Sequence, residues 1–277
     1  MIKKQMIMDK SLELFAKQGI KATSIQEITD ACGISKGAFY LSFKSKDALI
    51  LALIDHFMKE VISDIDRLVR ESDKKDLLYN YYYHNFENLS DKSAFAKVFI
   101  KEQMQFLDNE FIARVHQYTD LMHRSILFMI EKTYGDKVER IKYDMVYSIQ
   151  GLTKSYMELI LFGNFQMDID LLAKSLTEKT DLLANHLKTP YIEADLYQVM
   201  KQPEKGVFSR KEIIRIVDEV ICTMDTSIEK ESLSLLKEEL IEPSMSQAMI
   251  KGLLENIKHD PNCKWAGYLL RTYFKMG

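Results

Sequence analysis

Residues that interrupt helices are scarce in this sequence. Its 277 residues include only 10 Gly and 4 Pro, while 47% of the residues are hydrophobic. Because Gly and Pro break helices, their scarcity favours helix almost throughout the chain. At this length the chain can bury a large core, and we expect two or three lobes.

Disulfide, secretory and membrane-spanning patterns are also missing. The three cysteines are scattered and odd in number: Cys32, Cys222 and Cys263. They argue against a disulfide framework and indicate a reducing cytoplasm. We expect no signal peptide, because charged residues begin at Lys3. We also expect no membrane partner, because the longest apolar segment, residues 159–165, is far too short to span a bilayer.

Motifs for catalysis and metal binding are absent as well. The chain has no Gly-rich phosphate loop, no nucleophile elbow and no His/Glu metal motif. His84, His116 and His123 lie on predicted helices, and the last two are two helical turns apart, which is poor for joint metal ligation. We therefore expect no enzyme, no metal site and no cofactor.

Charge is distributed unevenly along the chain. The net charge is −3, but residues 1–47 hold eight Lys and five acidic residues, a balance of +3, so the remainder sums to −6. A modestly basic end on an acidic body is typical of a local DNA-binding module.

Residues 24–46 have the pattern of two short helices joined by a tight turn. The first helix is predicted over 25–32, with Ser24 as its N-cap and Glu27 as the capping-box partner. Gly33 follows at once, where a helix end often needs a residue that tolerates a left-handed backbone. Together with an amphipathic helix over 2–18, these signals predict a helix-turn-helix.

The second helix of the pair begins after Ser35 and extends to about Phe43. Its opening residues are small, polar or cationic, as a helix tip inserted into a major groove requires. Phe39 and Phe43 are expected in the core, and Lys44 is expected to be a solvated charge. The alternative for this region is a plain three-helix subdomain without a DNA role.

Several segments in this region resemble the N-terminal domain of TetR/AcrR-type regulators. They are residues 15–19 (FAKQG), 22–28 (ATSIQEI), 31–37 (ACGISKG) and 39–49 (FYLSFKSKDAL). The resemblance covers about residues 5–55 without a gap. It implies an all-helical homodimer, in most cases a repressor, whose variable C-terminal domain dimerises and binds a small ligand.

The resemblance also assigns roles to single residues. Tyr40 and Lys46 correspond to a phosphate-binding tyrosine and lysine, and the remaining contacts follow from side-chain chemistry at the helix tips. The predicted DNA-binding residues are Thr23, Ser24, Ser35, Lys36, Gly37, Ala38, Tyr40, Ser42 and Lys46. Ala38 and Ser42 stand where Thr and His are usual, and Thr29 stands where Ala is usual, so the operator sequence does not follow from relatives.

The middle of the chain is predicted to form six helices. They cover residues 46–70, 76–89, 92–106, 109–134, 140–163 and 169–188. Most of the aromatic side chains there are expected in a core, but their number also suits a cavity for a planar or lipophilic ligand. The predicted ligand-binding residues are Phe86, Phe95, Phe99, Met104, Tyr118, Met122, Phe128 and Tyr156.

Residues 191–277 extend beyond the usual end of similar proteins, near residue 190. Helices are predicted from Ser209 to about Asp225, and over 227–241, 246–258 and 260–274. This addition would enlarge a dimer interface, cover the pocket or bind another protein.

The sequence as a whole predicts an all-α protein in three parts. These are a helix-turn-helix domain over 1–46, a ligand-binding and dimerisation body over 47–190, and a helical lobe over 191–277. The expected partners are a near-palindromic DNA operator, a second copy of the chain, and a small hydrophobic or aromatic effector that releases a repressor from DNA. Two alternatives stay open: a helical adaptor protein, and a DNA-binding activator without a ligand.

Overall fold

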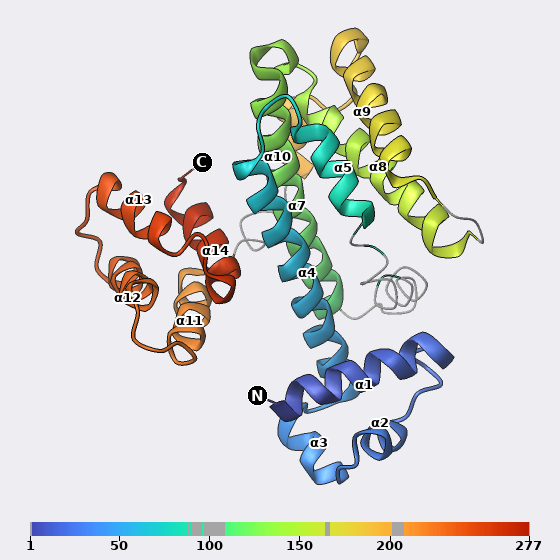
Figure 1. The fold of residues 1–277 in the computed structure, drawn as a ribbon, viewed down its shortest axis with the longest axis vertical. Coiled ribbons are helices and arrows are strands. Elements are labelled where there is room, and N and C mark those ends of the chain that lie inside the picture. Colours follow the sequence, from blue (N-terminus) through green and yellow to red (C-terminus); the bar gives the residue numbers. More distant parts are fainter. Residues whose placement is uncertain are drawn as a thin grey trace. The chain divides into compact units, whose positions relative to one another are not determined.

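The computed structural model describes residues 2–87, 89, 96, 109–163, 167–200 and 208–276, and these residues form helices joined by turns, with no strand among them (Figure 1). The predicted all-α class is confirmed. The helix predicted over 92–106 lies outside the described residues. Contacts between residues divide the chain into two compact units, Met1–Met58 with Arg67–Lys201, and Lys59–Asp66 with Gln202–Gly277.

The first unit begins with three helices that form a small N-terminal head. They are α1 (Ile2–Gln18), α2 (Ile25–Cys32) and α3 (Lys36–Ser42). Each of the three packs on the other two. Their shared core contains Phe15, Ile28 and Phe39, none of them more than 2% exposed. Burial of these side chains holds the two short helices, which would be marginal alone.

A long helix, α4 (Lys46–Glu71), follows the head. Ser45 caps it by accepting a hydrogen bond from the Ala48 backbone N–H. Its 26 residues extend over about 39 Å at the usual helical rise. At its other end, the Lys132 ammonium donates to the carbonyl oxygens of Val69 and Ser72, over 2.8 and 3.1 Å. A cation there satisfies carbonyls that a helix terminus leaves without partners.

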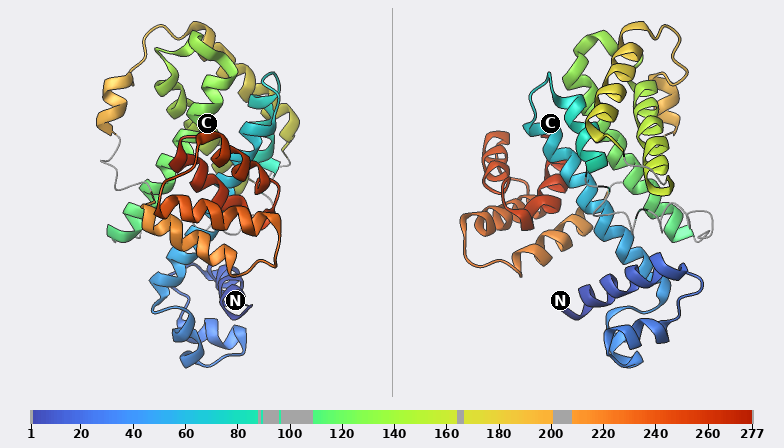
Figure 2. Two further views of the ribbon diagram at one scale, coloured as in Figure 1. Left: turned by 90° about the vertical axis from the view of Figure 1, so that its left-hand side faces the viewer. Right: turned by 45° about the vertical axis from the view of Figure 1, so that its right-hand side comes forward.

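Among the described residues, the body of the first unit contains six further helical segments. They are α5 (Leu77–Glu87), α7 (Asn109–Tyr134), η1 (Gly135–Val138), α8 (Lys142–Phe162), α9 (Ile169–His186) and α10 (Ala194–Met200). The α8 helix packs on α7 and α9, and α9 packs on α5 (Figure 2). Inside this packing, the hydroxyls of Tyr82 and Thr180 share a buried hydrogen bond of 2.8 Å.

The α10 helix is absent from the sequence-based expectation. It is only seven residues long and offers little periodicity. Its Tyr197 is 3% exposed and stacks on Tyr143 of α8, with ring centroids 4.3 Å apart. Packing across the fold therefore stabilises a helix that the local sequence signals weakly.

The second unit is a helical lobe. It contains α11 (Arg210–Ile221), α12 (Ile228–Ile241), α13 (Gln247–Asn256), η2 (Pro261–Cys263) and α14 (Lys264–Phe274), together with residues 59–66 of α4. Each long helix packs on the next, and α14 also packs on α11. The helix predicted to reach Asp225 ends at Ile221, and the last predicted helix is divided into η2 and α14. No helix in the described part of the chain is long and apolar enough to cross a membrane.

Candidate nucleic-acid interface

The start of α2 is held by a complete capping box. The Ser24 hydroxyl accepts a hydrogen bond from the Glu27 backbone N–H over 3.2 Å, and the Glu27 carboxylate accepts one from the Ser24 backbone N–H over 2.7 Å. The bond from the Ser24 backbone N–H, followed by those from the Gln18 amide and the Ser24 hydroxyl to the same carboxylate, lowers the pKa of Glu27 below its ordinary value of 4.5. The sequence pattern predicted this local structure, and the capping is confirmed.

The turn between α2 and α3 depends on Gly33. Its backbone lies in the left-handed region, with φ 63° and ψ 35°. The N–H of Gly33 donates to the carbonyl of Asp30, and the N–H of Ile34 donates to that of Thr29. A residue with a Cβ would be strained in this conformation. The turn therefore sets the angle at which α3 leaves α2.

The α3 helix has one buried and one exposed face. Phe39 is fully buried and Phe43 is 4% exposed, as predicted, and their rings contact each other at 5.9 Å between centroids. Lys36 and Gly37 are exposed, while Ala38 and Ser42 are half-buried. Two aromatic anchors therefore fix which side of this seven-residue helix faces outward.

Leu41 belongs to the exposed face of α3, although sequence reasoning did not select it. Its side chain is 90% exposed, and Tyr40 beside it is 52% exposed. Helical spacing could have identified Leu41, because it lies four residues after Gly37 and two residues from each buried phenylalanine. An apolar side chain held in solvent at this place suits contact with a thymine methyl group.

Tyr40 and Lys46 are held in different ways. The Tyr40 ring contacts the Phe39 ring edge-on, with centroids 5.6 Å apart, and the residue is about half exposed. The Lys46 ammonium donates a hydrogen bond of 2.6 Å to the carbonyl oxygen of Thr23. An ammonium group can donate up to three hydrogen bonds.

Three other predicted contact residues already take part in the fold of the head. Thr23 is 1% exposed and donates from its hydroxyl to the Gly19 carbonyl over 2.8 Å. Ser24 forms the capping box, and the Ser35 hydroxyl caps α3 by accepting from the Ala38 N–H over 3.2 Å. The Thr23 side chain is thus directed into the head, so its structural part is to support the start of α2.

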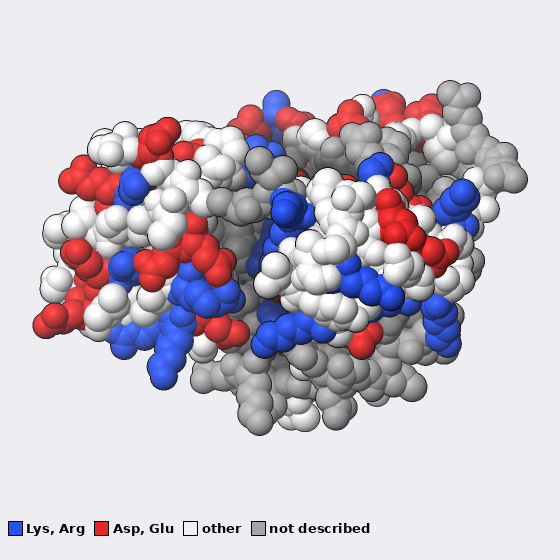
Figure 3. Space-filling view, turned by 90° about the horizontal axis from the view of Figure 1, so that it is seen from below, with Lys and Arg blue, Asp and Glu red and all other residues white. Residues whose placement is uncertain are grey.

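On the face seen from below, the Lys and Arg side chains of the described residues are dispersed (Figure 3). Figure 3 shows Lys and Arg side chains separated by uncharged residues on the side seen from below, without one continuous basic sheet. Lys36 and Lys44 are exposed at or beside α3, whereas Lys10 is paired with Glu13 at 2.8 Å. Such a surface favours contact with a limited number of phosphates rather than coating of nucleic acid.

The predicted effector-binding residues are distributed over several helices. Phe95, Phe99 and Met104 lie outside the described residues. Phe86 and Tyr118 are buried, and the side chains of Met122, Phe128 and Tyr156 are half-buried. Two of them face cations: the Phe128 ring lies 5.4 Å from the Arg70 guanidinium, and the Tyr156 ring lies 5.7 Å from the Lys179 ammonium.

Tyr118 connects α7 to α4. Its hydroxyl donates to Asp55 Oδ1 over 2.7 Å, and Arg114 Nε lies 3.5 Å from the same oxygen. Burial first, and then the Asp55 charge, raise the pKa of Tyr118 well above its ordinary value, so the hydroxyl remains a proton donor. A displacement of α7 near Tyr118 would therefore be transmitted to α4 through this hydrogen bond.

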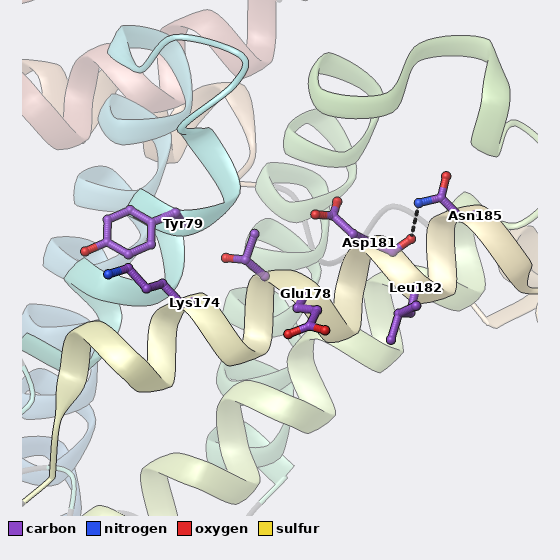
Figure 4. Close-up of a pocket in the computed structure, with 7 residues that line it drawn as sticks. Tyr79, Lys174, Glu178, Asp181, Leu182 and Asn185 are labelled. Carbon is purple, nitrogen blue, oxygen red and sulfur yellow. Dashed lines mark hydrogen bonds between the residues drawn. The ribbon is translucent and has the colours of Figure 1, made fainter.

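A hollow of about 370 Å³ lies between α5 and α9, and none of its lining residues is a predicted effector residue. Figure 4 shows its polar lining, with Tyr79 from α5 beside Lys174 from α9. Tyr79 donates to Asp170 over 2.9 Å, and Lys174 pairs with the same carboxylate at 2.6 Å. Across the described ranges, no three His, Cys, Asp or Glu side chains gather as metal ligands.

Comparison with known proteins identifies relatives of the head and of the whole chain. Residues 7–53 match the family described as bacterial regulatory proteins, tetR family. The chain is 29% identical to the uncharacterized HTH-type transcriptional regulator YerO of Bacillus subtilis (strain 168), over 92% of this chain and 89% of that protein. It is 25% identical to YuxN of the same organism, also an HTH-type transcriptional regulator, over 92% and 91% of the two chains.

Solved structures agree on the fold. A transcriptional regulator of the TerR/AcrR family from Aquifex aeolicus VF5 aligns with a TM-score of 0.51 and 24% identity, over 65% of this chain and 99% of that one. The rest of this chain has no counterpart there. Residues 202–277 make up more than a quarter of the sequence, so the match to YerO, which covers 92% of it, includes most of them.

Proposed function

Because this chain belongs to the TetR/AcrR family of helix-turn-helix transcriptional regulators, we propose that it is a repressor whose homodimer binds a near-palindromic operator and is released by a small hydrophobic or aromatic effector. The observation that supports this most directly is the exposed face of α3, opposite Phe39 and Phe43. A protein acting on DNA in this way works in the cytoplasm, as the cysteine pattern also indicates.

In the proposed complex, α3 lies in the major groove. Lys36, Gly37, Ala38 and Ser42 approach base edges, with Leu41 as an added apolar contact. Tyr40 and Lys46 bind phosphate oxygens and so set the register without reading the sequence. Ser24 and Ser35 cap α2 and α3 at the helix starts that approach further phosphates, and Thr23 supports them from inside the head.

The proposed dimer interface lies on α8 and α9. Large apolar side chains are exposed on both helices: Leu159, Phe162, Leu171 and Leu182, between 44% and 62% exposed. Two helices from each protomer would cover them in a four-helix bundle. The dimer then presents two α3 helices to half-sites about one DNA turn apart, 34–36 Å.

The proposed effector enters the body between about residues 86 and 160 and displaces α4. The bond from Tyr118 to Asp55 and those from Lys132 to the end of α4 connect the body to this helix. By linkage, effector and operator then oppose each other by the same coupling free energy, typically about 1–3 kcal/mol. The effector would lower operator affinity, and the operator would lower effector affinity equally.

Fluorescence anisotropy with DNA fragments that flank the gene for this protein tests the proposal. We expect one fragment to bind at least about a thousandfold more tightly than a random duplex at a fixed salt concentration, as specific recognition requires. Equal affinity for every fragment would instead support a helical adaptor. Lipophilic aromatic compounds, added to the bound complex, should release the DNA; in vitro transcription from the same fragment distinguishes a repressor from an activator.

A further inference from the structure

The middle of α4 is part of the C-terminal lobe. Residues 59–66 of this helix group with residues 202–277, although the rest of α4 belongs to the first unit. Within this stretch Ile62, Ile65 and Asp66 are at most 5% exposed. This stretch of α4 is thus a buried part of the second unit.

Two ion pairs join this part of α4 to α14. Arg271 Nη2 lies 2.7 Å from Asp66 Oδ2, and both side chains are largely buried, at 16% and 6% exposed. Lys264 Nζ lies 3.3 Å from Asp64 Oδ1, with side chains 35% and 31% exposed. Lys264 and Arg271 are seven residues apart, so they lie on the same face of α14, two turns from each other. Charged groups that are this well matched specify one arrangement of the two helices.

Aromatic packing reinforces the same contact. Lys59 Nζ lies 6.0 Å from the centre of the Trp265 ring. Trp265 stacks on Tyr268 at 5.4 Å, and Phe208 meets Trp265 edge-on at 5.5 Å. Tyr268 lies on the face of α14 that carries Lys264 and Arg271, four residues after the first and three before the second.

We propose that α14 is a clamp on α4, and that the C-terminal lobe thereby controls operator binding separately from the effector site in the body. This inference rests on the proposed function, because it assigns the lobe a part in the same regulation. Its physical basis is conformational entropy: a loosened α4 must be ordered again when both heads dock on one operator. On the operator, both heads must be in register at once. A weaker clamp therefore lowers the affinity for the operator more than the affinity for a random duplex.

A charge-reversal cycle on the partly exposed pair provides the test. Asp64→Lys and Lys264→Glu each place like charges together, and the double variant restores a pair. We expect each single variant of the full-length protein to bind the operator about three- to fivefold more weakly, in keeping with a partly exposed ion pair. The salt dependence of binding should stay unchanged, because no phosphate contact is lost. The double variant should recover the affinity.

Asp218 and Lys237 supply a matched control inside the lobe. They pair at 2.8 Å between α11 and α12, with side chains 46% and 30% exposed. Asp218→Lys and Lys237→Glu should leave operator affinity unchanged. Hydrogen exchange of the backbone amides of 59–66 gives an independent readout: exchange should accelerate in the two clamp variants and not in the control variants.

The possible outcomes separate the two proposals. If wild-type protein binds no fragment specifically, the proposed function fails and the clamp has nothing to control. If wild-type protein binds its operator and the clamp variants bind it equally well, while exchange over 59–66 is faster, only the clamp is refuted. Failure of the double variant to restore affinity would also overturn it.

Discussion

The ammonium group of Lys46 lies 2.6 Å from the carbonyl oxygen of Thr23, to which it donates a hydrogen bond. This bond connects the first turn of α4 to the residue that precedes the cap of α2. A rotation of α4 at its start would therefore be transmitted to the helix that supports α3. Lys46 combines this structural bond with its proposed phosphate contact.

Lys46→Ala tests both roles. We expect weaker binding to every duplex and a salt dependence whose slope is smaller by about one, because one phosphate contact is lost. Anisotropy titrations at several salt concentrations measure the slope. Lys188→Ala, at an exposed site after α9, controls for the loss of one positive charge. If the slope of the salt dependence stays unchanged while the thermal stability falls, Lys46 has a structural role through its bond to Thr23 and no phosphate contact.

Tyr40→Phe removes only the hydroxyl that is proposed to bind phosphate. The ring keeps its edge contact with Phe39, so the melting temperature should stay the same. The affinities for specific and random duplexes should both fall by about tenfold, because a hydrogen bond to a charged group usually contributes that much to binding. Tyr191→Phe, at a ring that is 83% exposed, is the control. A change in preference among operator sequences would contradict a phosphate role.

The capping box makes the head sensitive to acid. The folded state lowers the pKa of Glu27 below 4.5, so the unfolded state binds the proton more readily. Stability contributed by the Glu27 carboxylate is therefore present above about pH 4.5 and is lost as the pH falls through the lower, folded value. Glu27→Gln should melt below wild type at pH 7, and the difference should shrink on acidification.

Calorimetry or circular dichroism across this pH range would measure the Glu27 effect. Glu178→Gln, on the exposed side of α9, corrects for the general loss of one acidic group. A difference between wild type and Glu27→Gln that stays constant from pH 7 to about pH 3 would show that the carboxylate charge adds nothing to the cap.

Leu182→Glu tests the proposed dimer interface. The side chain is 53% exposed in one chain, so the substitution should leave the protomer folded. In a dimer it would bury a charge without a partner, which costs several kcal/mol, about 3 or more. We expect monomers at micromolar concentration by sedimentation, and weaker operator binding. Ile241→Glu, at a site 56% exposed in the other unit, should leave the association state unchanged.

The bond from Tyr118 to Asp55 is expected to couple the body to α4. Tyr118→Phe should lower the free energy of unfolding by about 1–2 kcal/mol, because Asp55 loses a buried donor. Tyr82→Phe, which breaks the buried bond to Thr180, should cost a similar amount and provides the control. Denaturant titrations measure both. Only Tyr118→Phe should also alter operator affinity; equal effects of the two variants on DNA binding would argue against a specific connection.

Local features of the fold could be predicted from sequence because their causes are local. Ser24 and Glu27 are three residues apart, which alone allows a reciprocal cap, and Gly33 tolerates the left-handed turn that follows. The burial of Phe39 and Phe43 follows from their spacing on one helix face. For the candidate interface, the same spacing defines most of the exposed face of α3, including Leu41.

The partners of side chains that are distant in sequence were decided by the tertiary structure alone. No local pattern indicates that Lys46 bonds to the Thr23 carbonyl or that Tyr118 reaches Asp55. Nor does any indicate that Arg271 pairs with Asp66, 205 residues earlier, since periodicity selects the face of a helix but not the helix that will cover it. The short helices and their exposed faces were thus set by neighbouring residues, and the connections of α4 by the packing of the whole chain.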